Sequence, residues 1–432
     1  MTNRFRRATL LVLTLVLLTA GLLPLKAVAD PIDPMQRTWM RTDQPVASGE
    51  ESRTWMWGPQ ETAYATEESY VESPDGEREV IYYDKSRMEV TQPDGDTSSP
   101  WYVTNGLLVV EMVEGYFQTG NSARDDLPEP ADVPVAGDPG GGGLTYAEIA
   151  AFGLRAEPAR TVGAGIAEYV DDDGTIRTGD QYAGYGVTAA YEVTEFGVNH
   201  TVASVFWEFM NSSGTVFENG AFTNALLFEN AFYATGYPIT EAYWTTASVG
   251  GTPTEVLWQC FERRCLTWTP GNDPGWQVEA GNVGQHYYQW RYGEDRPAAP
   301  TLAVTFNIYY QGELVGTTAT HETFLGDTAV GTWTTVTPDG AELSHGTLVA
   351  DHTLVSVEAA IVQTWPFEGT ATLAFDYSIS LGGIGGDGTL AWTANLPTGP
   401  ESGTTNFTAS STTLDIWDIE VDSLPPVLFT GE

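Results

Sequence analysis

The passage Tyr82-Tyr83-Asp84-Lys85-Ser86-Arg87-Met88 has a counterpart later in the chain, Cys260-Phe261-Glu262-Arg263-Arg264-Cys265-Leu266. Both passages run from an aromatic residue through acidic and basic residues to an apolar one, and a proline follows each of them. A second match comes next: Trp-x-Val-x-x-Gly-x-apolar, at 101–108 and again at 276–283. Because the spacing of Trp, Val and Gly is the same in both copies, we infer an internal duplication.

Each copy predicts a small hairpin, followed by a turn and one packed element. A unit of this size buries little surface by itself and needs neighbours. We expect the glycine of the motif, Gly106 or Gly281, to adopt a backbone conformation that other residues resist.

The composition of the other parts of the 432-residue chain indicates where its domains begin and end. Several acids, four prolines and a glycine run make 121–145 a segment that should not bury a core, and so a linker. After 301, alternating apolar and polar residues separated by turns predict an antiparallel sandwich or barrel. The expected organisation is a signal peptide at 1–29, a first repeat unit at 30–120, a linker at 121–145, a second repeat unit at 146–296 and an all-β domain at 301–432.

The fold class expected from these patterns is mainly β with few short helices. Val283, Tyr287 and Trp290 stand at helical spacing and predict a helix over 282–292. Two further short helices are expected at 146–154 and 206–210.

The first 29 residues have the pattern of a secretory signal peptide. Arginines at positions 4, 6 and 7 precede an almost wholly apolar stretch, and Ala27-Val28-Ala29 supplies a small-x-small cleavage site. An uncleaved membrane anchor is the alternative, because the apolar stretch approaches spanning length. We therefore expect a secreted protein, extracellular or associated with the cell surface and wall, that has no transmembrane segment after cleavage.

The charge of the chain excludes some partners. There are 18 Lys+Arg against 58 Asp+Glu, which gives a formal net charge of −40, and Lys26 and Lys85 are the only lysines. Nucleic acids and anionic lipid surfaces are bound through clustered basic residues, which this acidic chain lacks. We expect no nucleic acid partner.

Cys260 and Cys265 are the only cysteines. On one straight strand, positions five apart would lie about 16 Å apart and face opposite ways. If 261–264 form the loop of a hairpin, the two become cross-strand neighbours and a disulfide is feasible. In an exported chain we favour this disulfide, with buried free thiols as the alternative. A metal site would need more ligands, and only His286 lies nearby in the sequence.

The sequence contains no motif that we interpret as catalytic or cofactor-binding; Gly383-x-Gly385-x-x-Gly388 matches a dinucleotide pattern but leads into a strand and predicts a hairpin turn. There is no Gly-x-Ser-x-Gly elbow and no phosphate-binding loop. Asp171-Asp172-Asp173-Gly174 resembles part of a calcium loop, but Tyr169 occupies the first ligand position, so we favour a solvated acidic turn. We predict no catalytic residue, no metal ligand and no cofactor, with calcium at this turn as the alternative.

Aromatic residues concentrate in the second copy. The group consists of Trp258, Trp268, Trp276, Tyr287, Tyr288 and Trp290. Rigid aromatic faces stack on sugar rings, while neighbouring amides and carboxylates bind hydroxyl groups. These six residues are therefore our candidate ligand-binding site for a polysaccharide or another glycan. The alternative is that they fill the core of a small repeat.

The second copy is similar to LGFP-type repeats, which occur in tandem in bacterial cell-wall-associated proteins. The likeness rests on Thr235-Gly236-Tyr237-Pro238 as the Gly-aromatic-Pro tetrapeptide, on Phe261-Glu262 in the hairpin, and on Val278-x-x-Gly281. The first copy departs from the pattern, because Trp57-Gly58-Pro59 lacks the intervening aromatic residue.

The longer span 35–292 also resembles an uncharacterised family of secreted bacterial proteins. Residues 206–214 and 281–288 carry that likeness. The family has no established activity, whereas LGFP repeats are thought to anchor proteins to the cell wall. The resemblance therefore implies attachment to the cell wall.

Together these observations predict a secreted, non-catalytic protein of the cell envelope. It would bind cell-wall polysaccharide or another envelope glycan, and so retain itself or a partner at the surface. A secreted glycoside hydrolase is the alternative, since a pair of catalytic carboxylates leaves no local sequence motif. An adhesin that binds through 301–432 is a third reading.

Overall fold

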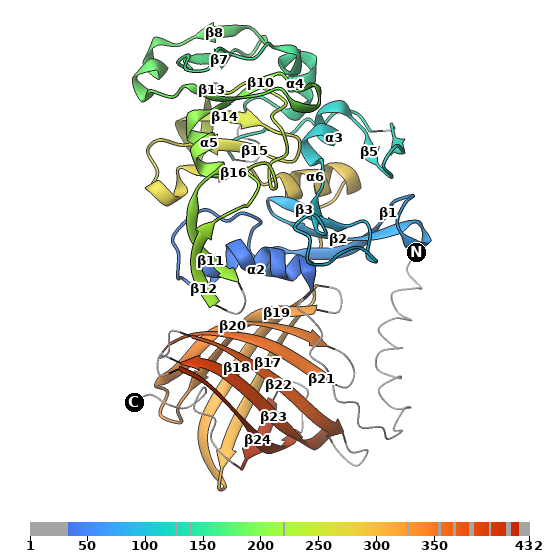
Figure 1. Ribbon diagram of the computed structural model, residues 1–432, viewed down its shortest axis with the longest axis vertical. Helices are drawn as coiled ribbons and strands as arrows, with labels where there is room; N and C mark the ends of the chain where they lie inside the picture. The colour runs from blue at the N-terminus through green and yellow to red at the C-terminus, as the bar shows by residue number, and fades with distance from the viewer. Residues whose placement is uncertain are drawn as a thin grey trace. The chain divides into compact units, whose positions relative to one another are not determined.

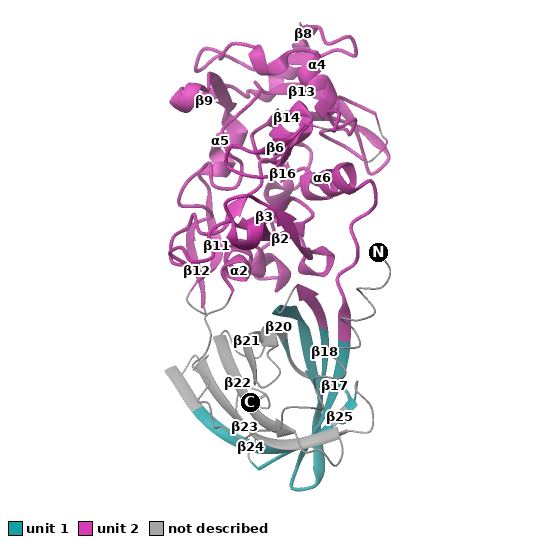
Figure 2. Ribbon diagram, turned by 90° about the vertical axis from the view of Figure 1, so that its right-hand side faces the viewer, with its two compact units in different colours: residues 1–32, 303–321, 327–432 teal, residues 33–302, 322–326 magenta. Residues whose placement is uncertain are grey.

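The computed structural model describes residues 33–422, apart from 127, 139, 141, 219–220, 326–327, 353–355, 366–368, 380–383, 397–398 and 412–415. The signal peptide predicted at 1–29 lies outside the described residues. The described chain is mainly β and forms two compact units (Figure 1, Figure 2). The N-terminal unit is Asp33–Leu302 with Glu322–Gly326, and the barrel unit is Ala303–His321 with Asp327–Glu432.

The barrel unit is a closed sheet of nine strands in sequence order (Figure 1). Each of strands β19 to β24 pairs antiparallel with the strand that follows it, and the sheet closes where β17 runs parallel to β25. The strands are β17 (Thr301–Tyr310), β18 (Glu313–Leu325), β19 (Thr328–Val336), β20 (Glu342–His352), β21 (Ser356–Trp365), β22 (Gly369–Ile379), β23 (Ile384–Leu396), β24 (Gly399–Ser411) and β25 (Ile416–Val421). The predicted all-β C-terminal domain is confirmed, and of the two architectures expected it is the barrel.

Two sheets of the N-terminal unit carry the two copies of the sequence motif. The first has the antiparallel order β1 (Tyr64–Ser69), β2 (Glu77–Tyr83), β3 (Ser86–Val90) and β4 (Thr104–Asn105), and helix α3 (Leu108–Glu114) follows it. The second has the order β16 (Val278–Ala280), β15 (Cys265–Trp268), β14 (Thr252–Cys260), β13 (Tyr243–Val249), β7 (Glu168–Val170) and β8 (Ile176–Thr178). Helix α6 (Val283–Tyr292) follows β16 in the chain.

The smaller elements include the three helices that the sequence predicts. They are α4 (Tyr146–Ala151), α5 (Ser204–Met210) and α6. Three two-stranded hairpins complete the unit: β5 (Phe117–Gln118) with β6 (Arg124–Asp125), β9 (Ala189–Val193) with β10 (His200–Ala203), and β11 (Ser213–Glu218) with β12 (Ala221–Leu226).

Helix α2 (Pro34–Ala47) was not predicted, although it begins with the usual signals. The side chain of Asp33 accepts hydrogen bonds from the backbone N–H groups of Met35 and Gln36. Pro34 stands at the first helical position, where its missing N–H costs nothing. A second proline inside the helix, Pro45, obscured the pattern.

The two copies of the motif have the same local structure: a hairpin, a short strand and then a helix. Gly106 donates its N–H to the carbonyl of Arg87 at 2.9 Å, and Gly281 does the same to Cys265 at 3.1 Å. Each hairpin tip also meets the helix of the other copy. The carbonyl of Asp84 accepts from Gln285 in the first turn of α6, and the carbonyl of Glu262 accepts from Val110 in the first turn of α3.

Because each hairpin tip contacts the helix of the other copy, both copies share one hydrophobic core. A cluster of buried apolar residues takes Val80 and Leu108 from the first copy and Trp258 and Val283 from the second. The segment 121–145, expected to be a linker, contributes buried residues to the same cluster. Its backbone pairs with the helix end, since Ala131 donates to the carbonyl of Met112 at 2.8 Å, and a segment paired in this way can be buried although it is rich in proline.

The glycine of the motif does not have the conformation that we expected. Neither Gly106 nor Gly281 has a positive φ. A Cβ at Gly106 would lie 2.7 Å from Leu108 Cδ2 and 2.8 Å from Glu89 Oε1, whereas a Cβ at Gly281 would meet nothing closer than 3.5 Å. In the first copy the glycine is therefore required by close packing rather than by its backbone angle.

Candidate glycan-binding cleft

A cleft of about 540 Å³ opens in the N-terminal unit beside the first sheet. Arg78 of β2 and Glu89 of β3 line it together with Asn105 of β4. The connection between β3 and β4 supplies Trp101, and the tip of the β14–β15 hairpin supplies Arg263. Both copies of the motif therefore contribute to this one site.

Trp101 is the exposed aromatic residue of the cleft. Its side chain is 46% exposed, and its ring centre lies 5.5 Å from that of Tyr233. Tyr233 is itself buried and fixed, since its hydroxyl donates to the carbonyl of Val103 at 2.8 Å. Tyr102 also lines the cleft and donates to the carbonyl of Pro93 at 3.0 Å. One aromatic ring is thus held in place with much of its surface open to a ligand.

A row of buried ions runs from the cleft into the unit. Arg78 Nη1 lies 2.8 Å from Glu89 Oε2, and Arg87 Nη2 lies 2.6 Å from Glu89 Oε1. Arg87 Nη1 lies 3.2 Å from Glu68 Oε2, which in turn lies 3.3 Å from Arg291 Nη1. The cross-strand pairing explains this row, because residues opposite each other on neighbouring strands point to the same face of a sheet. Positive and negative groups therefore alternate along one face, and Arg78 is the end of the row in the cleft.

Glu111 of α3 joins the row at its centre. Its Oε1 lies 3.4 Å from Arg87 Nη2, and its Oε2 accepts from the hydroxyl of Tyr287. Burial raises the pKa of Glu68, but Arg87 and Arg291 outweigh burial, so this pKa lies below its ordinary value. In Glu111 burial dominates, and the pKa is raised although Arg87 is near. Arg87 thus has three carboxyl groups around it and is the centre of the cluster.

The structure corrects the sequence-based glycan site. Trp258, Tyr287 and Tyr288 are buried in the core, with at most 5% of each exposed. For these three residues the alternative prediction, that they fill the core, is correct. They cannot stack on a sugar while the unit is folded. Sequence reasoning did not separate them from exposed aromatics, because local spacing does not report which element covers a ring.

The other three predicted residues are half-buried and contact neighbours outside the cleft. The ring centre of Trp268 lies 5.8 Å from that of Trp244. Trp276 donates to Ser52 Oγ at 3.3 Å, and Trp290 donates to the carbonyl of Glu129 at 2.9 Å. None of the six predicted residues is among the residues that line the cleft. The signal that could have found Trp101 is its place in the motif, where it is the counterpart of Trp276.

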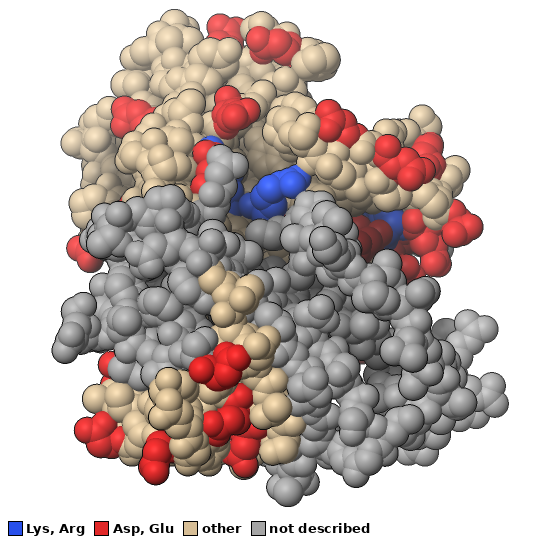
Figure 3. Space-filling view, turned by 60° about the horizontal axis from the view of Figure 1, so that its bottom comes forward, with Lys and Arg blue, Asp and Glu red and all other residues tan. Residues whose placement is uncertain are grey.

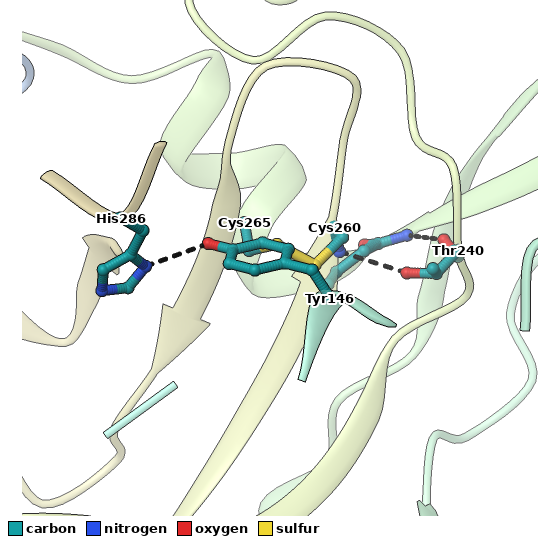
Figure 4. The surroundings of a disulfide bond; sticks show 6 residues. Tyr146, Thr240, Cys260, Cys265 and His286 are labelled. Carbon is teal, nitrogen blue, oxygen red and sulfur yellow. Dashed lines mark hydrogen bonds between the residues drawn. A yellow bond between two sulfur atoms is a disulfide. The ribbon is translucent and has the colours of Figure 1, made fainter. Parts of the chain in front are cut away.

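The predicted disulfide is confirmed. Cys260 and Cys265 face each other across the β14–β15 hairpin and are joined, with their Cα atoms 3.9 Å apart. Cys260 donates its N–H to Thr240 Oγ1 at 3.1 Å, and nearby the hydroxyl of Tyr146 points to His286 Nδ1 at 3.2 Å (Figure 4). Burial and the charge of Lys85 lower the pKa of His286 to about 4, so this imidazole is neutral at pH 7.

The acidic turn considered for calcium is paired within the protein. Arg177 Nε lies 2.6 Å from Asp171 Oδ2, and Arg177 Nη2 lies 3.8 Å from Asp173 Oδ2. In the described part of the chain, no three His, Cys, Asp or Glu side chains are grouped so that they could hold a metal ion.

Acidic side chains are scattered over the described part of the face drawn in Figure 3, where fewer basic ones reach the surface. None of the helices among the described residues combines the length and the apolar character needed to cross a membrane.

Comparison with models of known protein families gives no match, and comparisons with curated proteins and with solved structures give none either. What the cleft binds therefore has to be inferred from its own chemistry.

Proposed function

We propose that the protein is a secreted, non-catalytic protein of the cell envelope that binds a glycan in the cleft beside the first sheet. The observation that carries this proposal is Trp101, whose ring is 46% exposed and steadied by a buried tyrosine in a polar cleft. An exposed ring of this kind can stack on the C–H surface of a sugar.

The polar groups around Trp101 suit a ligand that is rich in hydroxyls. Amide side chains of Gln118, which is half-buried, and Asn121, which is exposed, line the cleft, and an amide carries both donors and acceptors. Asn105 also lines it but is buried and bonded to Ser86 and Tyr233. A few polar groups beside an aromatic surface are the usual composition of a small-molecule or sugar site. The cleft therefore supports glycan binding, and the LGFP-like repeat that we propose for the two copies would place this binding at the cell wall.

Glycoside hydrolysis is not the function that this cleft supports best. A hydrolase needs one carboxyl group that holds a proton near neutral pH. Both oxygens of Glu89 accept hydrogen bonds from arginines, Oε1 from Arg87 and Oε2 from Arg78. The hydrogen bonds from Ser98 lower the pKa of Asp96, the other acid of the cleft. Neither group is placed to act as a general acid.

The test is co-sedimentation of the protein without its predicted signal peptide, residues 30–432, with insoluble cell-wall glycan. We expect Trp101→Ala to weaken binding about tenfold, which is the usual loss when an aromatic anchor is removed. Trp276→Ala is the matched control, since Trp276 holds the same place in the other copy and lies outside the cleft. Failure of the unaltered protein to bind, or equal binding by both variants, would refute the proposal.

A further inference from the structure

Arg78, at the end of the ion row, has hydrogen-bonding capacity that the protein does not use. Its side chain is 2% exposed, and its Nη1 pairs with Glu89. Its Nε and Nη2 have no hydrogen-bond partner among the described residues. These two nitrogens lie on the same edge of the guanidinium, which is the edge that binds both oxygens of one carboxylate or phosphate. Leaving such donors without partners in a buried group is costly.

We propose that the glycan bound in the cleft carries an anionic group, a carboxylate or a phosphate, and that Arg78 binds this group through Nε and Nη2. This inference rests on the proposed glycan-binding function and names the class of glycan. It assigns Arg78 as the residue that selects acidic over neutral sugars.

The ion row supports an anion at this position. The charges alternate from Arg291 through Glu68, Arg87 and Glu89 to Arg78. Arg78 stands at the end of the row and, among the described residues, shares its one ion-pair partner, Glu89, with Arg87. An anion beyond Arg78 would continue the alternation.

A second arginine gives the cleft further positive charge. Arg263 donates through Nη1 to the carbonyl of Tyr233, and its Nε has no hydrogen-bond partner among the described residues. No ion pair within 4.0 Å involves Arg263 in the part of the chain that the structure describes. A chain with 18 basic against 58 acidic residues thus places two arginines in this cleft beside two acids, Glu89 and Asp96. The cleft is thus balanced in charge, so an anion meets less repulsion there than the net charge of the whole chain, −40, would produce.

The geometry also sets how the anion would enter. The Cζ atom of Arg78 lies 4.0 Å from the ring centre of Tyr70, so this ring covers one face of the guanidinium and leaves hydrogen bonding to its edge. Nε and Nη2 are shielded from solvent, and an anion therefore has to displace side chains over them. Tyr70 also lines the cleft, and its hydroxyl donates to the exposed Asn121 at 2.9 Å.

The experiment compares three preparations of insoluble cell-wall glycan at constant ionic strength. One is intact, one has its carboxylates converted to amides, and one has its phosphates removed by hydrofluoric acid. Four proteins, all without the predicted signal peptide, are sedimented with each preparation: the unaltered protein, Arg78→Lys, Arg263→Gln and the control Arg155→Lys. Lysine keeps a positive charge toward Glu89 but loses the two-donor edge. Arg155 is exposed, pairs with Glu114 and does not line the cleft.

We expect one of the two treatments to weaken binding about tenfold or more, which identifies the anion as carboxylate or phosphate. Arg78→Lys should bind the intact glycan as weakly as the unaltered protein binds the treated one, and the treatment should then cause no further loss. Arg263→Gln should also reduce the difference in binding between intact and treated glycan. If Arg78→Lys does not fold, the result for Arg263→Gln tests the inference.

Equal binding to all three preparations, with Trp101→Ala still weakening it, would overturn the acidic-glycan inference and leave glycan binding in place. Full binding by both Arg78→Lys and Arg263→Gln would overturn it as well. No binding of the unaltered protein to the intact glycan would refute the proposed function and this inference together.

Discussion

The hairpins β2–β3 and β14–β15, one in each copy of the motif, are stabilised by different interactions at equivalent positions. The cross-strand pair Cys260–Cys265 of β14–β15 has as its counterpart in β2–β3 the pair Tyr82–Arg87, which is one pair away from the tip. The cysteine pair is a covalent bond among apolar neighbours. The pair Tyr82–Arg87 has no covalent link, and Arg87 is instead surrounded by carboxyl groups of the ion row.

The difference shows where each hairpin is sensitive to substitution. A disulfide stabilises mainly by restricting the unfolded chain, and it does so weakly when the loop is short, as it is with a sequence separation of five. A buried guanidinium has a larger effect when it is lost, because its removal leaves buried carboxylates without their counter-charge. The hairpin that lacks the disulfide should therefore be the more sensitive of the two.

The largest expected effect is that of Arg87→Met. Since Glu68, Glu89 and Glu111 would lose their common partner, we expect a loss of about 4 kcal/mol in the free energy of unfolding. The double change Cys260→Ala/Cys265→Ala should cost about 2 kcal/mol, as estimated from its short loop. Urea unfolding followed by tryptophan fluorescence measures both.

The control for charge removal is Arg155→Met, because Arg155 forms an exposed ion pair with Glu114 and should change stability by less than about 0.5 kcal/mol. If the cysteine variant lost more stability than Arg87→Met, the comparison of the two hairpins would be reversed.

An effect of intermediate size is expected when pH changes the protonation of His286, in the second copy, and so the stability of the fold. His286 has a folded-state pKa of about 4 against an ordinary value of 6.5, so the unfolded chain binds a proton in this window and the folded chain does not. The stability from neutral His286 is complete above pH 6.5 and is lost as pH falls toward 4, by about 2 kcal/mol for this half-buried ring.

His286→Gln removes this titration and should flatten the acid limb of the stability curve relative to the unaltered protein. The comparison between the two proteins is needed because Asp43 acts in the opposite direction. Burial raises the pKa of Asp43 to about 6, despite three backbone N–H donors, so its contribution grows as pH falls. Parallel curves between pH 7 and 4 would show that His286 is already protonated or solvated in the folded state.

The smallest expected effect separates the two motif glycines. Gly106→Ala would push a methyl group against Leu108 and Glu89, so we expect a loss of about 1–2 kcal/mol. Gly281→Ala meets only ordinary contacts and should change stability by less than about 0.5 kcal/mol. Thermal unfolding of the two variants measures the difference, and equal melting temperatures would mean that the first copy is no more tightly packed than the second.

Several elements followed from local patterns. The alternation after 301 predicted β strands, and the helical spacing of Val283, Tyr287 and Trp290 predicted α6. Cys260 and Cys265 could be paired because a hairpin loop was the geometry that brings residues five apart together. These features depend on side-chain direction within one element or one turn, which spacing in the sequence reports.

The candidate site could be predicted only in part. An aromatic residue in a polar cleft agrees with the kind of site expected from the sequence, but the residue is Trp101 rather than any of the six predicted ones. The burial of Tyr287 depends on β2, some 200 residues earlier in the chain, whose Tyr82 ring lies 6.3 Å away. No local pattern in the second copy contains that information.

By itself, the sequence determined the β-rich class, the two hairpins, the helix that follows the second of them, the disulfide and the all-β C-terminal domain. The tertiary structure alone decided that both copies share one core, that Arg87 gathers three carboxyl groups, and that Arg78 and Trp101 meet Arg263 in one cleft. The physical reason is that periodicity fixes which way a side chain points within its own element. What that side chain then meets depends on elements that are distant in the sequence and become neighbours only on folding.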